Sequence, residues 1–148
     1  MGRSGYFACR HKKNRMGEEV ILCDSNILIN WFKNDAPTKE ALEKIGLNQI
    51  MISSITRMEL YQGCRDKNEL HKMKQRLNNY NILHFNEGIS QLAERLVEKY
   101  KLSNNLQIPD AIIGASSIHS KIPLFTYNVK DFSFMPGIKL FHAHPTGT

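Results

Sequence analysis

The stretch Val20-Ile-Leu-Cys-Asp-Ser-Asn26 decides the fold of this chain, because a short apolar run ends abruptly on a carboxylate. The run lacks the polar alternation of a half-exposed strand, so it predicts a strand buried on both faces, as in a parallel sheet. In such sheets, ligands bind beyond the carboxyl ends of the strands. Asp24 therefore lies where we expect a functional site.

The length and composition of the chain fit one globular domain. It has 148 residues, of which 41% are hydrophobic and 23% are charged. No apolar stretch approaches the roughly 20 residues that span a bilayer, and the N-terminus lacks the apolar core of a secretory signal. We therefore expect a cytoplasmic protein that does not enter a membrane. We expect residues 1–17 to form a flexible basic extension and residues 18–143 to form the folded domain. Residues 144–148 are expected to form a loose tail.

The charge and the cysteines restrict the chemistry. A formal net charge of +6, from 20 Lys and Arg against 14 Asp and Glu, favours a polyanionic partner such as nucleic acid. The cysteines are Cys9, Cys23 and Cys64. An odd number without a CxxC pair argues against a disulfide framework and against a thiolate zinc site. The net charge thus indicates a kind of partner, but it does not indicate which reaction the protein catalyses.

Apolar runs and helical periodicities alternate along the chain. Further strands are expected at 49–54, 80–85 and 122–127, with a short fifth at 138–142. Helices are expected over 26–34, 38–47, 55–63, 65–79, 86–100 and 108–119. This order predicts an α/β fold, a three-layer α/β/α domain around a mainly parallel sheet of about four to five strands.

Four acids occupy equivalent positions in this arrangement. Asp24 follows the first strand, Glu59 lies in the helix after the second, Asp110 begins the helix before the fourth, and Asp131 follows the fourth. The carboxyl ends of parallel strands meet at one edge, so these acids should converge there. Carboxylates without a cluster of His or Cys indicate a hard cation, and Mg²⁺ or Mn²⁺ is the expected occupant.

Each acid also has a purely structural interpretation. Asp24 can form an Asx turn, Glu59 can complete a capping box with Thr56, Asp110 can favour a helix dipole, and Asp131 can cap the residues after it. These interpretations are reasonable one at a time. Four carboxylates gathered at one sheet edge repel each other, however, unless a cation or a proton compensates them.

The motifs that carry these acids resemble those of PIN-domain nucleases, specifically the small VapC-type toxin ribonucleases of toxin–antitoxin pairs. The resemblance spans about residues 20–142. It rests on Leu22-Cys-Asp-Ser-Asn26, Ile52-Ser-Ser-Ile-Thr-Arg-Met-Glu-Leu60, Ile108-Pro-Asp-Ala-Ile-Ile-Gly-Ala115 and Thr126-Tyr-Asn-Val-Lys-Asp-Phe132. Four motifs in this order and at this spacing form a specific pattern.

The resemblance implies a PIN-like domain and assigns roles to residues. Asp24, Glu59, Asp110 and Asp131 would be the catalytic, metal-binding acids, and Thr126 and Asn128 would support them. The resemblance also implies an RNA substrate, a cognate antitoxin and a homodimer. The expected reaction is hydrolysis of RNA phosphodiesters by a water that Mg²⁺ or Mn²⁺ activates.

Basic residues near these motifs are candidates for binding the substrate. Arg57 and Lys130 lie beside the acids in sequence, and a basic run extends from Arg65 to Arg76. Such residues can neutralise phosphates and make binding depend on salt. The basic run is equally well interpreted as a solvated helix face.

Two other classes of protein also place acids on an α/β sheet edge. A phosphoacceptor signalling domain needs an acidic pair near the first strand, whereas this chain has Asp24-Ser-Asn26 there. A catalytically silent PIN-like module that binds RNA or protein has no need of clustered repulsion. Replacing Asp110 by Asn separates the enzyme from the module, because only the enzyme then loses an activity.

Overall fold

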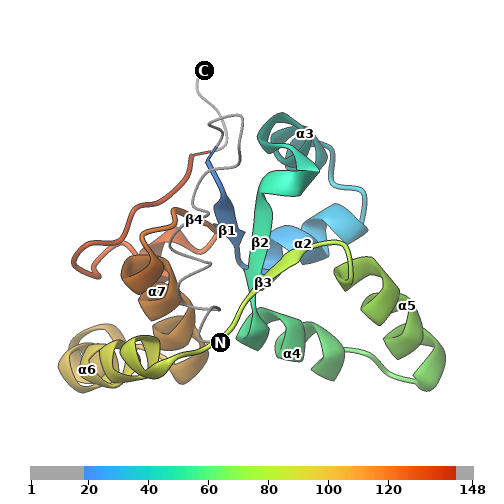
Figure 1. The fold of residues 1–148 in the computed structure, drawn as a ribbon. Helices are drawn as coiled ribbons and strands as arrows, with labels where there is room; N and C mark the ends of the chain where they lie inside the picture. The colour runs from blue at the N-terminus through green and yellow to red at the C-terminus, as the bar shows by residue number, and fades with distance from the viewer. Residues whose placement is uncertain (1–18, 143–148) are drawn as a thin grey trace.

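The computed structural model describes residues 19–142 of the chain (Figure 1). The predicted N-terminal extension, residues 1–17, and the predicted tail, residues 144–148, lie outside the described residues. Within residues 19–142, no helix combines the length and the apolar character needed to cross a membrane.

The centre of the structure is a parallel sheet of four strands in the order β3-β2-β1-β4. Leu22 pairs with Met51 on one side of β1 and with Leu124 on the other. The predicted parallel α/β architecture is thus confirmed. The strands are β1 (Ile21–Cys23), β2 (Ile50–Ser53), β3 (Asn81–Leu83) and β4 (Leu124–Phe125).

Helices cover both faces of this sheet. Figure 1 shows α6 and α7 on one side of the strands, with α2, α3 and α5 on the other. The helices are α2 (Ser25–Phe32), α3 (Ala36–Ile45), α4 (Ser54–Gln62), α5 (Lys67–Leu77), α6 (Glu87–Asn104) and α7 (Ile108–Ser120), and the short 3₁₀ turns are η1 (Leu47–Gln49) and η2 (Val129–Asp131).

The strand residues alternate between two hydrophobic cores. Leu22, Met51 and Leu124 belong to the core that includes buried residues of α6 and α7. Their neighbours Cys23 and Phe125 belong to the core under α2 and α3. Successive side chains of a strand point to opposite faces, so an unbroken apolar run supplies both cores.

The two neighbours of β1 are reached over opposite faces of the sheet. The chain passes from β1 to β2 through α2 and α3, and it reaches β4 only after α6 and α7. The direction of winding therefore reverses between β1 and β4. In open α/β sheets this switch point leaves a crevice beyond the carboxyl ends of the strands, where ligands bind.

The predicted fifth strand over 138–142 is wrong. Leu140 forms only an isolated parallel bridge with Leu124. The backbone of Leu124 uses both of its groups on this segment, donating to Lys139 O and accepting from Phe141 N. The chain leaves the sheet after Phe125. The strand β4 is therefore too short to form more than one bridge with the segment at 138–142.

Three helices, α2, α3 and α4, begin one or two residues earlier than the sequence predicted, and for α3 and α4 the N-cap differs from the predicted one. The N-cap of α4 is Ser53, whose hydroxyl accepts from the Ile55 N–H, so Thr56 lies inside the helix and forms no capping box. The N-cap of α3 is Asp35, which accepts from the Thr38 N–H at 3.2 Å. In both places an earlier cap was available immediately before the first helical residue.

Candidate metal and nuclease site

Asp24 directly follows β1 and serves as the N-cap of α2, accepting from the Ser25 N–H at 2.8 Å. Its other carboxylate oxygen accepts from the Thr126 hydroxyl at 2.8 Å and from Asn26 Nδ2 at 3.2 Å. Only 4% of the residue is exposed. Asp24 is therefore a buried carboxylate whose orientation is fixed from three sides.

Asn26 connects the ends of β1 and β4 at this point. Its Nδ2 also donates to the Thr126 hydroxyl at 3.3 Å, and its Oδ1 accepts from the Tyr127 N–H at 3.1 Å. The Asn128 N–H in turn donates to the Thr126 hydroxyl at 3.0 Å. This role of Asn26 was not predicted from sequence, although the order Asp-Ser-Asn after an apolar strand could have indicated it.

Glu59 reaches the same edge from α4, which packs against α2 and α7. One carboxylate oxygen of Glu59, Oε1, is buried and has no hydrogen-bond partner. Burial raises the pKa of Glu59, and the charge of Asp24 raises it further, while the Ser25 hydroxyl opposes the shift. The capping-box interpretation does not account for this residue, because Thr56 is not the cap.

Asp110 lies in the first turn of α7. Partial burial raises the pKa of Asp110 to about 6, and the charges of Asp24, Asp131 and Glu59 contribute in that order. Among residues 19–142, the ion pair that forms joins Arg65 to Glu69, so these acids have no cationic partner there. The four carboxylates share one electrostatic neighbourhood without compensation.

Asp131 completes the group from the 3₁₀ turn η2, immediately after β4. It is exposed, unlike Asp24, and its charge raises the pKa of both Asp24 and Asp110. For Asp24 this repulsion is a smaller effect than burial, which also raises its pKa, and three hydrogen bonds act in the opposite direction. The predicted acids thus come from β1, α4, α7 and η2.

The donor set fits a hydrated hard cation. Within the described part of the chain, no three Asp, Glu, His or Cys side chains are grouped closely enough to hold a metal ion directly. Mg²⁺ commonly keeps several waters and binds one or two carboxylates together with substrate phosphates. The unpaired oxygen of Glu59 and the uncompensated charges at this edge match that kind of site.

The predicted basic residues lie in different surroundings. Lys130 is exposed in η2, next to Asp131, whereas Arg57 is half-buried on α4. Arg57 precedes Glu59 by two residues, which places it roughly 200° away around the helix. It therefore serves a different face of α4 from the one that carries Glu59.

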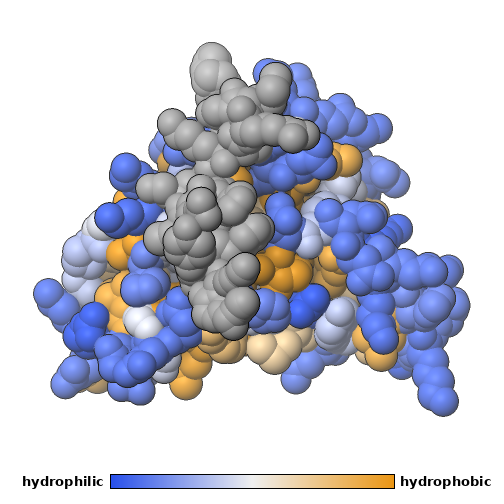
Figure 2. Space-filling view, viewed as in Figure 1, coloured by the Kyte–Doolittle hydropathy of each residue, from blue (hydrophilic) through white to orange (hydrophobic). Residues whose placement is uncertain are grey.

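The basic run of α5 forms a hydrophilic edge of the molecule (Figure 2). Arg65 is paired with Glu69 at 2.6 Å, and Arg76 stacks over the Phe32 ring at 4.6 Å. Both cations thus have local structural partners. Lys67, Lys72 and Lys74 are exposed and remain candidates for contacting phosphates.

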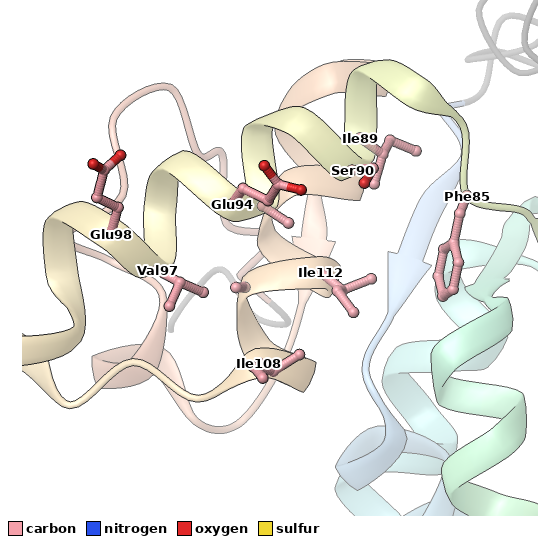
Figure 3. A pocket seen from close by; sticks show the side chains of 10 residues that line it. Phe85, Ile89, Ser90, Glu94, Val97, Glu98, Ile108 and Ile112 are labelled. Carbon is pink, nitrogen blue, oxygen red and sulfur yellow. The ribbon is translucent and has the colours of Figure 1, made fainter.

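A separate pocket of about 530 Å³ lies on the α6 and α7 side of the molecule (Figure 3). Its lining is mostly apolar, and Asp110 does not belong to it. Phe85 and Ile108, which contribute to the lining, are 42% and 64% exposed. Such walls suit an apolar group rather than a metal or a phosphate, so the carboxylate edge remains the candidate site.

The fold and this edge agree with one protein family. The family model of the PIN domain matches residues 21–135, so the chain belongs to the PIN-domain family. No curated protein sequence matches it significantly.

Solved structures place the chain more narrowly. A chain from a toxin–antitoxin complex of Klebsiella pneumoniae is 33% identical with a TM-score of 0.69, and the match covers 84% of this chain and 98% of that one. VapBC2 of Rickettsia felis, bound to a promoter DNA fragment, matches at 20% identity and a TM-score of 0.69, covering 82% and 97%. VapBC-1 of nontypeable Haemophilus influenzae matches at 22% identity and a TM-score of 0.71, and the match covers 84% of this chain and 98% of that one. The identification of a PIN domain from sequence is confirmed, and the relative that is 33% identical comes from a toxin–antitoxin complex.

Proposed function

We propose that this protein is a metal-dependent endoribonuclease that acts as the toxin of a toxin–antitoxin pair. The proposal is supported by the mutual repulsion of Asp24, Glu59, Asp110 and Asp131, which have no cationic partner among the described residues. Clustered carboxylates cost stability in the free protein, and a divalent cation removes that cost.

Mg²⁺ or Mn²⁺ is the proposed cofactor, with Asp24 and Asp110 as direct ligands and with Glu59 and Asp131 acting through water. The bound cation would supply Lewis-acid stabilisation of the charge that develops on the phosphate, and it would lower the pKa of a bound water. Thr126 and Asn26 hold the Asp24 carboxylate in one orientation. Asn128 is anchored beside them through its backbone.

Glu59 is the proposed base. Its carboxylate would accept a proton from the attacking water, and its raised pKa makes it a stronger base than an exposed glutamate. The water oxygen forms the new bond to phosphorus as the bond to the 3′ oxygen breaks, and that oxygen leaves with the electron pair and takes up a proton. The products are a 5′-phosphate and a 3′-hydroxyl.

Lys130 would neutralise a phosphate at the scissile bond of the bound RNA. Arg57 would neutralise a phosphate farther from that bond. The antitoxin partner is proposed from the K. pneumoniae relative, which was solved in a toxin–antitoxin complex. The homodimer and the cytoplasmic location remain predictions from sequence. The competing interpretation, a catalytically silent RNA- or protein-binding module, is less well supported because it leaves the repulsion among the acids unexplained.

The test is cleavage of labelled single-stranded and structured RNAs by the wild type and by the Asp110→Asn protein, with Mg²⁺, Mn²⁺ or a chelator. Metal-dependent cleavage that is lost in the variant, while RNA binding survives, is the expected result. The matched control is Glu98→Gln, an exposed acid on α6 away from the carboxylate edge. Equal inactivity of wild type and Asp110→Asn, with intact binding of RNA or of a partner protein, would identify the silent module.

A further inference from the structure

Tyr127 lies between the two polar residues of the β4 end that sequence analysis assigned to the site. Its neighbour Thr126 is buried against Asp24, whereas Tyr127 is 44% exposed. Its backbone N–H donates to Asn26 Oδ1, and Asn26 itself donates to Asp24. The backbone of Tyr127 is thus connected to the Asp24 carboxylate by two hydrogen bonds through Asn26.

The exposed ring is held in place from two directions. Its hydroxyl hydrogen-bonds to the hydroxyl of Thr38 at the start of α3, and Thr38 also donates to Asp35 Oδ2 at 2.6 Å. The ring meets the buried Phe125 ring edge-on, at 5.7 Å between centroids and 79° between planes. A side chain fixed in this way loses little conformational freedom when a ligand covers it.

The surroundings of the ring suit a nucleic-acid strand. Of the Phe, Trp and Tyr side chains in residues 19–142, Phe85 and Tyr127 are the exposed ones, and Phe85 lines the apolar pocket of α6 instead. Two exposed lysines are near in sequence, Lys39 directly after Thr38 and Lys130 three residues after Tyr127. A fixed, exposed aromatic ring in a basic protein is a feature on which unpaired bases stack.

We propose that Tyr127 forms a subsite on which one unpaired nucleobase of the RNA stacks, beside the phosphate that is cleaved. This inference rests on the proposed nuclease function and adds to it a determinant of substrate choice. The subsite favours single-stranded segments, because a base within a duplex cannot present its face to the ring.

The experiment compares two substitutions that both remove the hydroxyl contact with Thr38. Tyr127→Phe keeps the ring, and Tyr127→Leu removes it at similar size. Both are made in the Asp110→Asn background, so that RNA is bound without being cut. Affinities are measured by fluorescence anisotropy in magnesium buffer for a single-stranded RNA and for a set of copies that each carry one abasic position.

The expected result is that Tyr127→Phe binds the intact RNA like the parent, whereas Tyr127→Leu binds it roughly 5- to 150-fold more weakly. For one abasic RNA this difference should disappear, and that position identifies the stacked base. Equal affinities of the Phe and Leu proteins, or a loss for Leu that is the same on every abasic RNA, would overturn the subsite. If the parent bound none of the RNAs, the proposed function itself would fail, and the subsite with it.

Discussion

The Thr126 hydroxyl donates a 2.8 Å hydrogen bond to Asp24 across 102 positions of the chain. This contact joins the ends of β4 and β1 at the point where the winding of the sheet reverses. It also satisfies one oxygen of a carboxylate that has little access to water.

Replacing Thr126 by Val tests this contact. The loss of a hydrogen bond to a buried carboxylate should lower the free energy of unfolding by about 1–3 kcal/mol. Because the hydroxyl lowers the pKa of Asp24, its removal should raise that pKa and move the acid limb of the activity profile to higher pH. Thermal unfolding and a pH–rate profile measure the two effects. Thr126→Ser keeps the hydroxyl and should retain both properties, and a Val protein identical to wild type would contradict the assignment.

The clustered acids predict how stability depends on pH. An acid whose pKa is higher in the folded than in the unfolded protein binds its proton more tightly when folded. For Asp110 this range runs from about 4 in the unfolded chain to about 6 in the folded one. The metal-free protein should therefore lose stability as the pH rises through this range. Denaturant unfolding in a chelator at about pH 5 and about pH 7 measures the loss.

Magnesium should reverse that loss, because a cation replaces the protons that the carboxylates give up. The stabilisation by Mg²⁺ should be larger at neutral than at acidic pH. Asp110→Asn should be more stable than wild type in chelator at neutral pH and should respond less to Mg²⁺. An equal response of both proteins would show that Asp110 takes no part in binding the cation.

Asn26 is predicted to position the site rather than to react. Asn26→Asp keeps the shape but removes the amide donor and adds a negative charge beside Asp24, so cleavage should fall on the order of 10- to 100-fold, mainly in kcat. RNA affinity should change little, and Asn26→Ala, which removes the same hydrogen bonds without adding a charge, separates the loss of positioning from the effect of the added charge. A fall confined to KM would place Asn26 in substrate binding instead.

Lys130 should contact a phosphate, and salt reveals such contacts. Lys130→Ala should reduce the slope of log affinity against log salt by about 1. Arg65→Ala is the matched control, because Arg65 is already paired with Glu69 and its removal should leave the slope unchanged. Titrations of RNA at several salt concentrations measure both slopes. Equal slopes for Lys130→Ala and wild type would remove Lys130 from the interface.

The layers of this fold could be predicted from sequence because burial leaves a local pattern. The run from Val20 to Cys23 supplies side chains to both cores, and only a strand covered on both faces has that pattern. The positions of Asp24 and Asp131 followed from the same argument, because strand ends are visible as the points where apolar runs stop. The approximate bounds of the helices could also be predicted from sequence. The helices capped by Asp35 and Ser53 nevertheless begin earlier than predicted.

Features that depend on distant contacts could not be predicted in this way. The segment at 138–142 has the composition of a strand, but its pairing is limited to one bridge because β4 is so short. The roles of Asn26 and Tyr127 arise from contacts about 100 positions apart, which periodicity along the chain does not encode. The repulsion at Asp110 likewise appears only when four separate elements are placed together.

The carboxylates of the site are spread along the chain from residue 24 to residue 131, and the last of them follows the last strand of the sheet. A chain still under synthesis therefore has no complete site until Thr126, which donates to Asp24, and Asp131 have been made. For an enzyme whose proposed substrate is RNA, this order of assembly matters. Under the proposed function, the ribosome and the message that produce the protein would not be exposed to a complete nuclease site before Asp131 has emerged.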